Sequence, residues 1–268
     1  MNNTDIKQII EDTFDDISSL YDINEYFLIT AKKMVNNLEY KGYLNILDLS
    51  CGTGNVALLL ASKFKNSKVI GVDISSSMVE VASQKAKDLR LSNVQFIKAD
   101  VENLDYEDKT FDIITCGFGL FFYSNMNESL KSFMKLLKND GVFTFSSFTK
   151  EAFNPYSDIF LDTLHKDYGL DYPKGSNLFL ETEDEINDLV KTVGKYRHKI
   201  EKLEISKLIT VEQWWDTLNS AGYKGMLNQL SKDDLEKFKA EHFKDVSKFC
   251  KDEKINLQTD TFVTKVFI

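Results

Sequence analysis

Apolar side chains recur every three or four positions through the first forty residues, which places them on one face of a helix. The first set is Ile6, Ile10, Phe14, Ile17 and Tyr21. The second set is Phe27, Ala31, Met34 and Leu38. The spacing therefore predicts two amphipathic helices at the start of the chain.

Short apolar runs then alternate with amphipathic stretches as far as residue 150. The runs that predict buried strands are 44–49, 68–73, 93–99, 111–116 and 141–148. The stretches that predict helices are 56–64, 76–89 and 125–138. Strands that alternate with helices indicate parallel βαβ units, with helices on both faces of the sheet.

After residue 150 the alternation of predicted strands and helices becomes less regular. Two capping boxes, Thr182 with Glu185 and Thr210 with Gln213, predict helix starts. Residues 199–209 predict a sixth strand and 259–268 a seventh, and the segment between them is mostly helical. We expect an N-terminal helical lid over 1–40 and a ligand-binding α/β core over 41–150. Residues 151–268 are expected to form a helical cap and to complete the sheet.

Composition narrows the class of protein. The 268 residues are 43% hydrophobic and 28% charged, as in an ordinary globular protein. A formal net charge of −9 argues against a nucleic-acid partner. Cys51, Cys116 and Cys250 lack metal-ligand spacing, so we expect reduced thiols and no metal. The absence of a signal peptide or of a long apolar run predicts a cytoplasmic protein without a membrane partner.

The informative motif is a glycine loop between the first strand and the following helix, Asp48-Leu-Ser-Cys-Gly52-Thr-Gly54. Glycines there allow a ligand to approach the backbone closely, and the helix N-terminus offers free N–H groups. The second strand ends at Asp73, where a carboxylate can accept hydrogen bonds from both hydroxyls of a ribose. The third strand ends at Asp100, a second acceptor, where an adenine amino group could lie.

Together these motifs resemble the class I S-adenosylmethionine-dependent methyltransferases over about residues 40–150. The resemblance is greater to the small-molecule enzymes of the ubiquinone/menaquinone C-methyltransferase and malonyl-carrier-protein methyltransferase types. Phe14-Asp-x-Ile-x-x-Leu-Tyr21-Asp22 is similar to their N-terminal helix signature. The resemblance implies a doubly wound, seven-stranded, mostly parallel Rossmann-like sheet whose last strand is antiparallel, with a helical cap.

The resemblance also implies a role for each matching position. Asp73 would bind the ribose, while Asp100 and the Val101 N–H would bind adenine between Ile74 and Met78. Gly52 and Gly54 would line the cofactor, above Asp48, which orients the methionine amino group. Tyr21, and the loop that begins at Cys116 and Gly117, would hold the methionine end. Ser50 stands where many relatives have a glycine or another small residue, and we expect it to be tolerated at the cofactor site.

The implied activity is methyl transfer from S-adenosylmethionine to oxygen, carbon or nitrogen of a small acceptor, with S-adenosylhomocysteine as product. We expect an apolar or aromatic acceptor and a monomer or homodimer. The aromatic run 118–123 either lines the acceptor site or belongs to the core. A general base, if the reaction uses one, could be Tyr123, His165 or a carboxylate, and no motif selects among them.

Two other functions remain open on the sequence. The spacing Gly52-x-Gly54-x-x-Ala57 also satisfies the dinucleotide pattern, which would make the chain an NAD(P)-dependent oxidoreductase. The domain could also bind S-adenosylmethionine or S-adenosylhomocysteine without catalysis. Asp48, Asp100 and the two preceding helices favour the methyltransferase over the oxidoreductase.

Overall fold

The computed structural model describes residues 3–171 and 180–268. Its strands are β1 (Asn45–Leu49), β2 (Lys68–Asp73), β3 (Val94–Lys98), β4 (Phe111–Gly117), β5 (Leu137–Phe148), β6 (Arg197–Leu203), β7 (Ser206–Ile209), β8 (Ile255–Gln258) and β9 (Thr261–Phe267). Seven strands form one sheet in the order β3-β2-β1-β4-β5-β9-β6, and β7 and β8 form a separate ribbon. The last strand, β9, runs antiparallel to both of its neighbours. The predicted seven-stranded, mostly parallel sheet is therefore confirmed.

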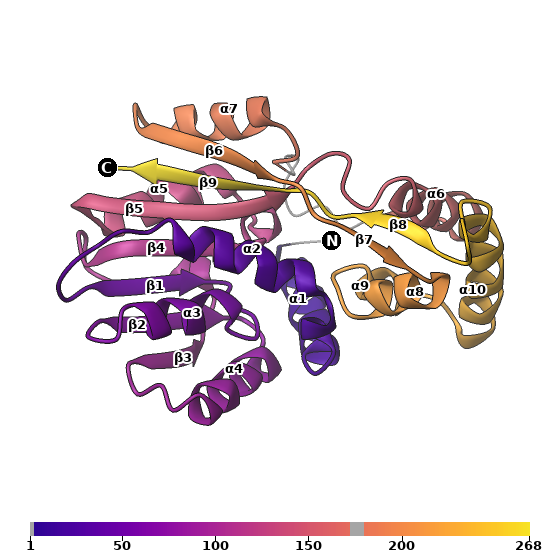
Figure 1. Cartoon of the computed structure of the whole chain (residues 1–268), viewed down its shortest axis with the longest axis horizontal. Coiled ribbons are helices and arrows are strands. Elements are labelled where there is room, and N and C mark those ends of the chain that lie inside the picture. The colour runs from indigo at the N-terminus through magenta and orange to yellow at the C-terminus, as the bar shows by residue number, and fades with distance from the viewer. Residues whose placement is uncertain (1–2, 172–179) are drawn as a thin grey trace.

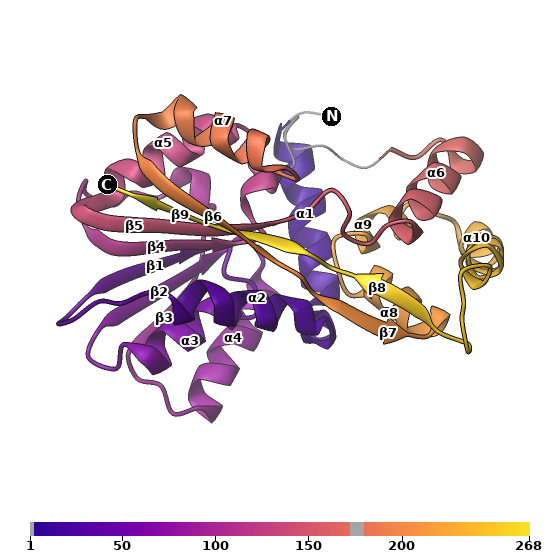
Figure 2. The same cartoon turned by 45° about the horizontal axis from the view of Figure 1, so that its top comes forward.

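Helices cover both faces of this sheet. The helices of the described residues, of which only some cover the sheet, are α1 (Asn3–Ile17), α2 (Glu25–Asn36), α3 (Asn55–Lys63), α4 (Ser76–Asp88), α5 (Met126–Leu136), α6 (Tyr156–Tyr168), α7 (Glu183–Val193), α8 (Val211–Asn219), α9 (Lys224–Leu227) and α10 (Lys232–Ser247). Figure 2 shows α2, α3 and α4 on one face and α5 and α7 on the other. The central strands β1 and β4 are buried on both sides, which explains their nearly continuous apolar sequences.

The two N-terminal helices have different places. Helix α1 lies across the carboxyl end of the sheet, next to the cap (Figure 1). Helix α2 instead packs on α3, where Ala31 and Met34 share a buried cluster with Ile46 of β1. Helix α7 packs on α5, away from the cap. Helix α2, which lies in the expected lid segment, and α7, which lies in the expected cap segment, therefore belong to the layers that cover the sheet.

The predicted sixth strand, 199–209, is in fact two strands, because the chain bends away from the main sheet between β6 and β7. The segment paired with it bends at the same level, between β8 and β9. The buried carboxylate of Asp260 lies at the bend and accepts a hydrogen bond from the Ile205 N–H at 2.9 Å. The N–H of Thr259 donates to the Ile205 carbonyl at 2.7 Å. Strands β7 and β8 therefore leave the main sheet together as one ribbon and enter the cap.

The cap is built from this ribbon together with α6, α8, α9 and α10 (Figure 1). Its core contains Trp214 and His242, whose ring nitrogens are joined by a hydrogen bond of 2.9 Å from the indole. Burial lowers the pKa of His242 to about 4, so the imidazole is neutral at neutral pH. His242 is therefore a packing residue of the cap.

Candidate active site

The glycine loop joins β1 to α3 in a tight turn. Ser50, Gly52 and Gly54 all have positive φ angles, of 50°, 52° and 83°. Gly54 is the N-cap of α3, and a Cβ atom there would lie 3.0 Å from the Phe96 ring and 3.1 Å from Ala82 Cβ. Glycine is therefore required at position 54 both for the backbone conformation and for space.

Asp73 ends β2 directly beside this loop. Its carboxylate accepts hydrogen bonds from the Gly52 N–H at 2.8 Å and the Ser75 N–H at 2.9 Å. The N-cap of α4 is Ser75, whose hydroxyl accepts from the Met78 N–H at 3.0 Å, so Asp73 is not needed as a cap. Burial raises the pKa of Asp73 above its usual value. The carboxylate is thus held at the loop by backbone donors alone.

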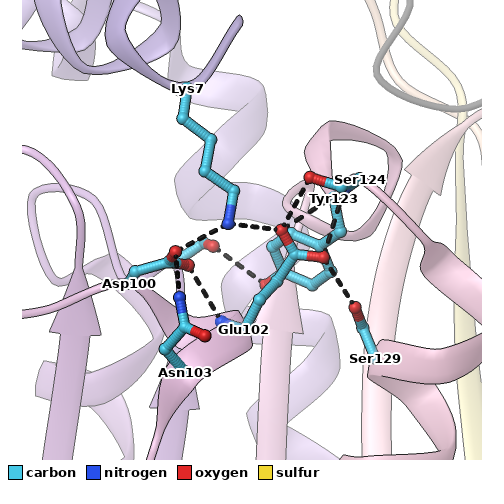
Figure 3. Close-up of polar contacts among 8 residues, drawn as sticks. Lys7, Asp100, Glu102, Asn103, Tyr123, Ser124 and Ser129 are labelled. Carbon is cyan, nitrogen blue, oxygen red and sulfur yellow. Dashed lines mark hydrogen bonds and ion pairs between the residues drawn. The ribbon is translucent and has the colours of Figure 1, made fainter. Parts of the chain in front are cut away.

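Asp100 follows β3 and meets a lysine from the N-terminal helix. The Lys7 ammonium lies 2.6 Å from the Asp100 carboxylate and 2.7 Å from that of Glu102 (Figure 3). Asp100 also accepts from the Glu102 N–H at 3.0 Å and the Asn103 side-chain amide at 2.7 Å. Helix α1 is therefore fastened to the end of the third strand by one ammonium between two carboxylates.

Glu102 links this ion pair to the loop after β4. It accepts hydrogen bonds from the Ser124 N–H and hydroxyl, both at 3.1 Å, and from the Ser129 hydroxyl at 3.0 Å (Figure 3). Partial burial disfavours the charged form, but Lys7 and these donors outweigh it and hold the pKa of Glu102 below its usual value. Sequence analysis missed Lys7 and Glu102, since no local pattern joins residues so far apart in the chain.

Asp48 lies beneath the glycine loop and is almost fully buried. Its carboxylate accepts from the Thr115 hydroxyl at 2.5 Å and the Ala57 N–H at 3.0 Å. Burial raises the pKa of Asp48 to about 7, and the nearby charge of Asp73 acts in the same direction. Among the described residues, no ion pair joins either carboxylate to a cation.

A cavity of about 670 Å³, which we call the loop cavity, opens above these residues. The structure brings together nine of the predicted residues in its lining: Tyr21, Ser50, Gly52, Asp73, Ile74, Asp100, Val101, Gly117 and Tyr123. Asp48 lines a smaller adjoining cavity, together with Gly52 and Gly117. Gly54, Met78 and Cys116 are outside the lining of both.

The two candidates for a general base differ in position. The Tyr123 hydroxyl is buried and hydrogen-bonded to the Ser50 hydroxyl at 2.9 Å and to Cys116 Sγ at 3.3 Å. Burial raises the pKa of Tyr123 well above its usual value, which disfavours a phenolate. His165 is an exposed residue of α6, paired with Asp171 at 2.8 Å, and lines neither the loop cavity nor the one next to it. The geometry therefore does not support His165 as a base.

The neighbouring cavity, which we call the aromatic cavity, has a volume of about 1,470 Å³. Ten aromatic side chains line it: Phe14, Tyr21, Tyr26, Phe27, Phe118, Phe121, Phe122, Phe148, Phe153 and Tyr223. Three charged residues, Lys150, Asp158 and Glu181, also contribute to its wall. Four of the ten rings line the loop cavity as well: Phe14, Tyr21, Phe118 and Phe122. The two cavities therefore adjoin across an aromatic boundary.

In the two described ranges, no group of three or more His, Cys, Asp or Glu side chains is arranged to hold a metal ion. Within the same ranges, no helix combines the length and apolar character needed to cross a bilayer.

Comparison with known proteins identifies the class. Residues 40–202 match the family model of the methyltransferase domain, which is more than half of the chain. The demethylmenaquinone methyltransferase of Staphylococcus saprophyticus is 29% identical over 205 residues, covering 74% of this chain and 85% of that protein. The enzyme of the same name from Bacteroides fragilis is 30% identical over 171 residues, covering 59% and 70%.

A solved structure agrees on the fold. The YcgJ protein of Bacillus subtilis superposes with a TM-score of 0.60 at 22% identity, covering 91% of this chain and 98% of that one. The chain belongs to the methyltransferase domain family. It is an S-adenosylmethionine-dependent methyltransferase, and the resemblance seen in the sequence is confirmed. None of the relatives described here favours an oxidoreductase or a non-catalytic binding protein.

Proposed function

We propose that the loop cavity binds S-adenosylmethionine and that the aromatic cavity binds the methyl acceptor. The observation that carries this assignment is the set of four rings that line both cavities. A methyl group has to pass directly from donor to acceptor, so the two sites must touch. The four shared rings, of Phe14, Tyr21, Phe118 and Phe122, support such a contact at the boundary of the two cavities.

The donor set at the loop cavity suits the adenosine part of the cofactor. Asp73 offers a carboxylate, held by two backbone N–H groups, to the two ribose hydroxyls. Asp100 retains acceptor capacity, because a carboxylate has about four lone-pair positions and three donors reach it here. Ile74 and Val101 supply apolar contact for the adenine ring.

The methionine part would lie toward β1 and β4. Asp48, Gly52, Gly117 and Tyr21 line that end, and the uncompensated carboxylates favour a ligand with positive charge. We propose that Gly54, Met78 and Cys116 act indirectly: they are packed behind the lining and hold the loop in place.

When bound, S-adenosylmethionine supplies a methyl group on a sulfonium sulfur, and a bond from the acceptor to that carbon forms as the carbon–sulfur bond breaks and sulfur keeps the bonding pair. The contribution of the protein is to align the two reactants and to exclude water. The faces of Phe118 and Tyr21 can stabilise a nearby cation. A proton released by the acceptor would have to pass to a general base or to water.

We propose an apolar or aromatic small molecule as the acceptor. Ten aromatic rings in one cavity provide a wall for a flat apolar body, and the relatives are named for demethylmenaquinone. Oligomeric state, whether monomer or homodimer, and a cytoplasmic location stay predictions from the sequence. The same holds for the division into 1–40, 41–150 and 151–268.

The test is calorimetric titration with S-adenosylhomocysteine, and separately with NAD and NADP. Replacement of Asp73 by Ala removes hydrogen bonds from a charged group, each worth about 1.5–3 kcal/mol, so we expect affinity for S-adenosylhomocysteine to fall at least about 100-fold. Asp88→Ala, on the exposed end of α4, is the matched control and should leave affinity unchanged. Unchanged affinity in Asp73→Ala, or binding of a nicotinamide nucleotide alone, would refute the assignment.

A further inference from the structure

One short turn of the chain contacts both the glycine loop and the cap. It consists of the 3₁₀ helix η1 (Tyr21–Ile23) and the following Asn24, and it joins α1 to α2. Tyr21 lines the loop cavity, the aromatic cavity and the smaller cavity next to the loop cavity. Its ring stacks on Phe27 at a centroid distance of 4.3 Å, and a Cβ atom at Gly52 would lie 3.8 Å from the ring. The turn thus brings an aromatic residue to the border of all three cavities.

Asp22 ties this turn to the donor side. Its carboxylate accepts hydrogen bonds from the Thr53 hydroxyl at 2.7 Å and the Asn55 side-chain amide at 3.0 Å. The Lys85 ammonium lies 2.9 Å from the other carboxylate oxygen. The three donors belong to the glycine loop, the start of α3 and the end of α4, so one carboxylate joins the turn to three separate segments.

Asn24 ties the same turn to the cap. It is 4% exposed, and its side-chain amide donates to the Ser220 carbonyl at 3.1 Å and to the Ser220 hydroxyl at 2.9 Å, at the end of α8. The amide also donates to the Tyr21 carbonyl at 3.2 Å. Tyr21 is therefore held between two polar anchors, one at the donor site and one in the cap.

Apolar packing contributes little to the position of the turn. Helix η1 has no buried residue of its own, and Ile23 is 58% exposed. An exposed turn with few buried contacts opens easily unless polar contacts hold it. The contacts of Asp22 and Asn24 therefore account for its fixed place.

We propose that Asp22 and Asn24 are positioning residues for methyl transfer, which hold the Tyr21 ring beside the sulfonium group of the bound donor. This inference rests on the proposed function of the loop cavity. The face of a tyrosine ring attracts a cation, most strongly where water is excluded. S-adenosylmethionine carries a positive charge on sulfur and S-adenosylhomocysteine does not, so the Tyr21 ring favours the reactant over the product.

Calorimetric titration of the whole chain with each of these two ligands tests the contact made by Tyr21. We expect Tyr21→Leu to weaken binding of S-adenosylmethionine at least about tenfold, and binding of S-adenosylhomocysteine less than about threefold. A purely structural role of Tyr21 would weaken both ligands alike. Equal losses would therefore overturn the proposal.

A double-mutant cycle tests whether the anchors act through Tyr21. Asp22→Ala should weaken binding of S-adenosylmethionine about fivefold in the wild-type background and less than about 1.5-fold in Tyr21→Leu, because a misplaced ring matters only while the ring is present. Asn24→Ala should show the same dependence on Tyr21. No loss in the wild-type background, or the same loss in both backgrounds, would contradict the roles of the two anchors.

Two further variants serve as controls. Asp22→Asn keeps an oxygen that can accept from Thr53, so it should recover part of the affinity that Asp22→Ala loses. Asp245→Ala is the matched control. The Asp245 side chain is 40% exposed and pairs with Lys248 at 2.6 Å, whereas that of Asp22 is 42% exposed. Because Asp245 lies on α10 and lines none of the three cavities, its replacement should leave both affinities unchanged.

The same titrations distinguish failure of the inference from failure of the proposed function. If the wild type binds both ligands and Asp73→Ala weakens them, but the Tyr21 and Asp22 variants behave like Asp245→Ala, only the inference fails. If the wild type binds neither ligand, the proposed function fails, and the inference with it.

Discussion

Replacement of Asp48 by Asn should stabilise the protein at neutral pH and leave it unchanged in acid. Asp48 is 1% exposed, and the described residues include no cation paired with it. An asparagine has nearly the same shape and can keep both contacts, accepting from the Ala57 N–H and donating to the Thr115 hydroxyl. The substitution therefore removes the buried charge with little other change.

The magnitude follows from the pKa of Asp48. Burial raises it from 3.8 in the unfolded chain to about 7 in the folded one. Below pH 3.8 the carboxyl is protonated in both states, so it makes no difference to stability. Between pH 3.8 and about 7 the folded state binds more protons, so stability falls as pH rises. At about 1.4 kcal/mol per pKa unit, the penalty above pH 7 reaches about 4 kcal/mol.

Urea denaturation followed by circular dichroism, at intervals from pH 4 to pH 8 and constant ionic strength, measures this effect. The difference in unfolding free energy between Asp48→Asn and the wild type should be near zero at pH 4 and should grow to about 4 kcal/mol in favour of the variant by pH 8. Asp260→Asn is the control. Its carboxylate is also buried but pairs with Lys202 at 3.2 Å, so the variant should lose stability. A difference for Asp48→Asn that stays constant with pH would refute the reasoning.

Two further variants test the packing around the site. Gly54→Ala and Gly169→Ala both place a side chain at a positive φ angle, at a cost of about 1–2 kcal/mol, but only Gly54 has atoms within 4 Å of the added Cβ. Urea denaturation should show Gly54→Ala to be the less stable by at least about 1 kcal/mol, and equal losses would contradict the crowding argument. Lys7→Met should loosen α1, raising amide hydrogen exchange over residues 6–17 roughly fivefold, whereas Lys248→Met removes an exposed pair and should not. Unchanged exchange in Lys7→Met would show that the ion pairs with Asp100 and Glu102 do not hold the helix.

Local sequence patterns predicted the strands of the α/β core and the glycine loop between the first strand and the following helix. Strands β1, β2 and β4 are short apolar runs with clear ends, and each predicted boundary lies within one residue of the observed one. The glycine loop was predictable because positive φ angles and close contact at Gly54 leave few alternatives to glycine. The strand ends that carry Asp73 and Asp100 follow from the same pattern.

The features that could not be predicted depend on partners distant in the chain. The break between β6 and β7 is stabilised by Asp260, which is 55 residues away from Ile205. Lys7 meets Asp100 across 93 residues, and nothing in the helical spacing of α1 distinguishes Lys7 from a solvated lysine. Nothing in the sequence distinguishes Tyr26 from other tyrosines, because the lack of a partner for its hydroxyl among the described residues depends on the folded structure.

Two buried carboxylates that are unfavourable in the free protein lie at the loop cavity and the smaller cavity next to it. Asp48 and Asp73 are buried carboxylates with raised pKa values, and the charge of Asp73 contributes to the raised pKa of Asp48. A cationic ligand close to them would favour the charged form of both carboxylates. Binding of the proposed cationic donor beside these carboxylates would therefore stabilise the folded protein.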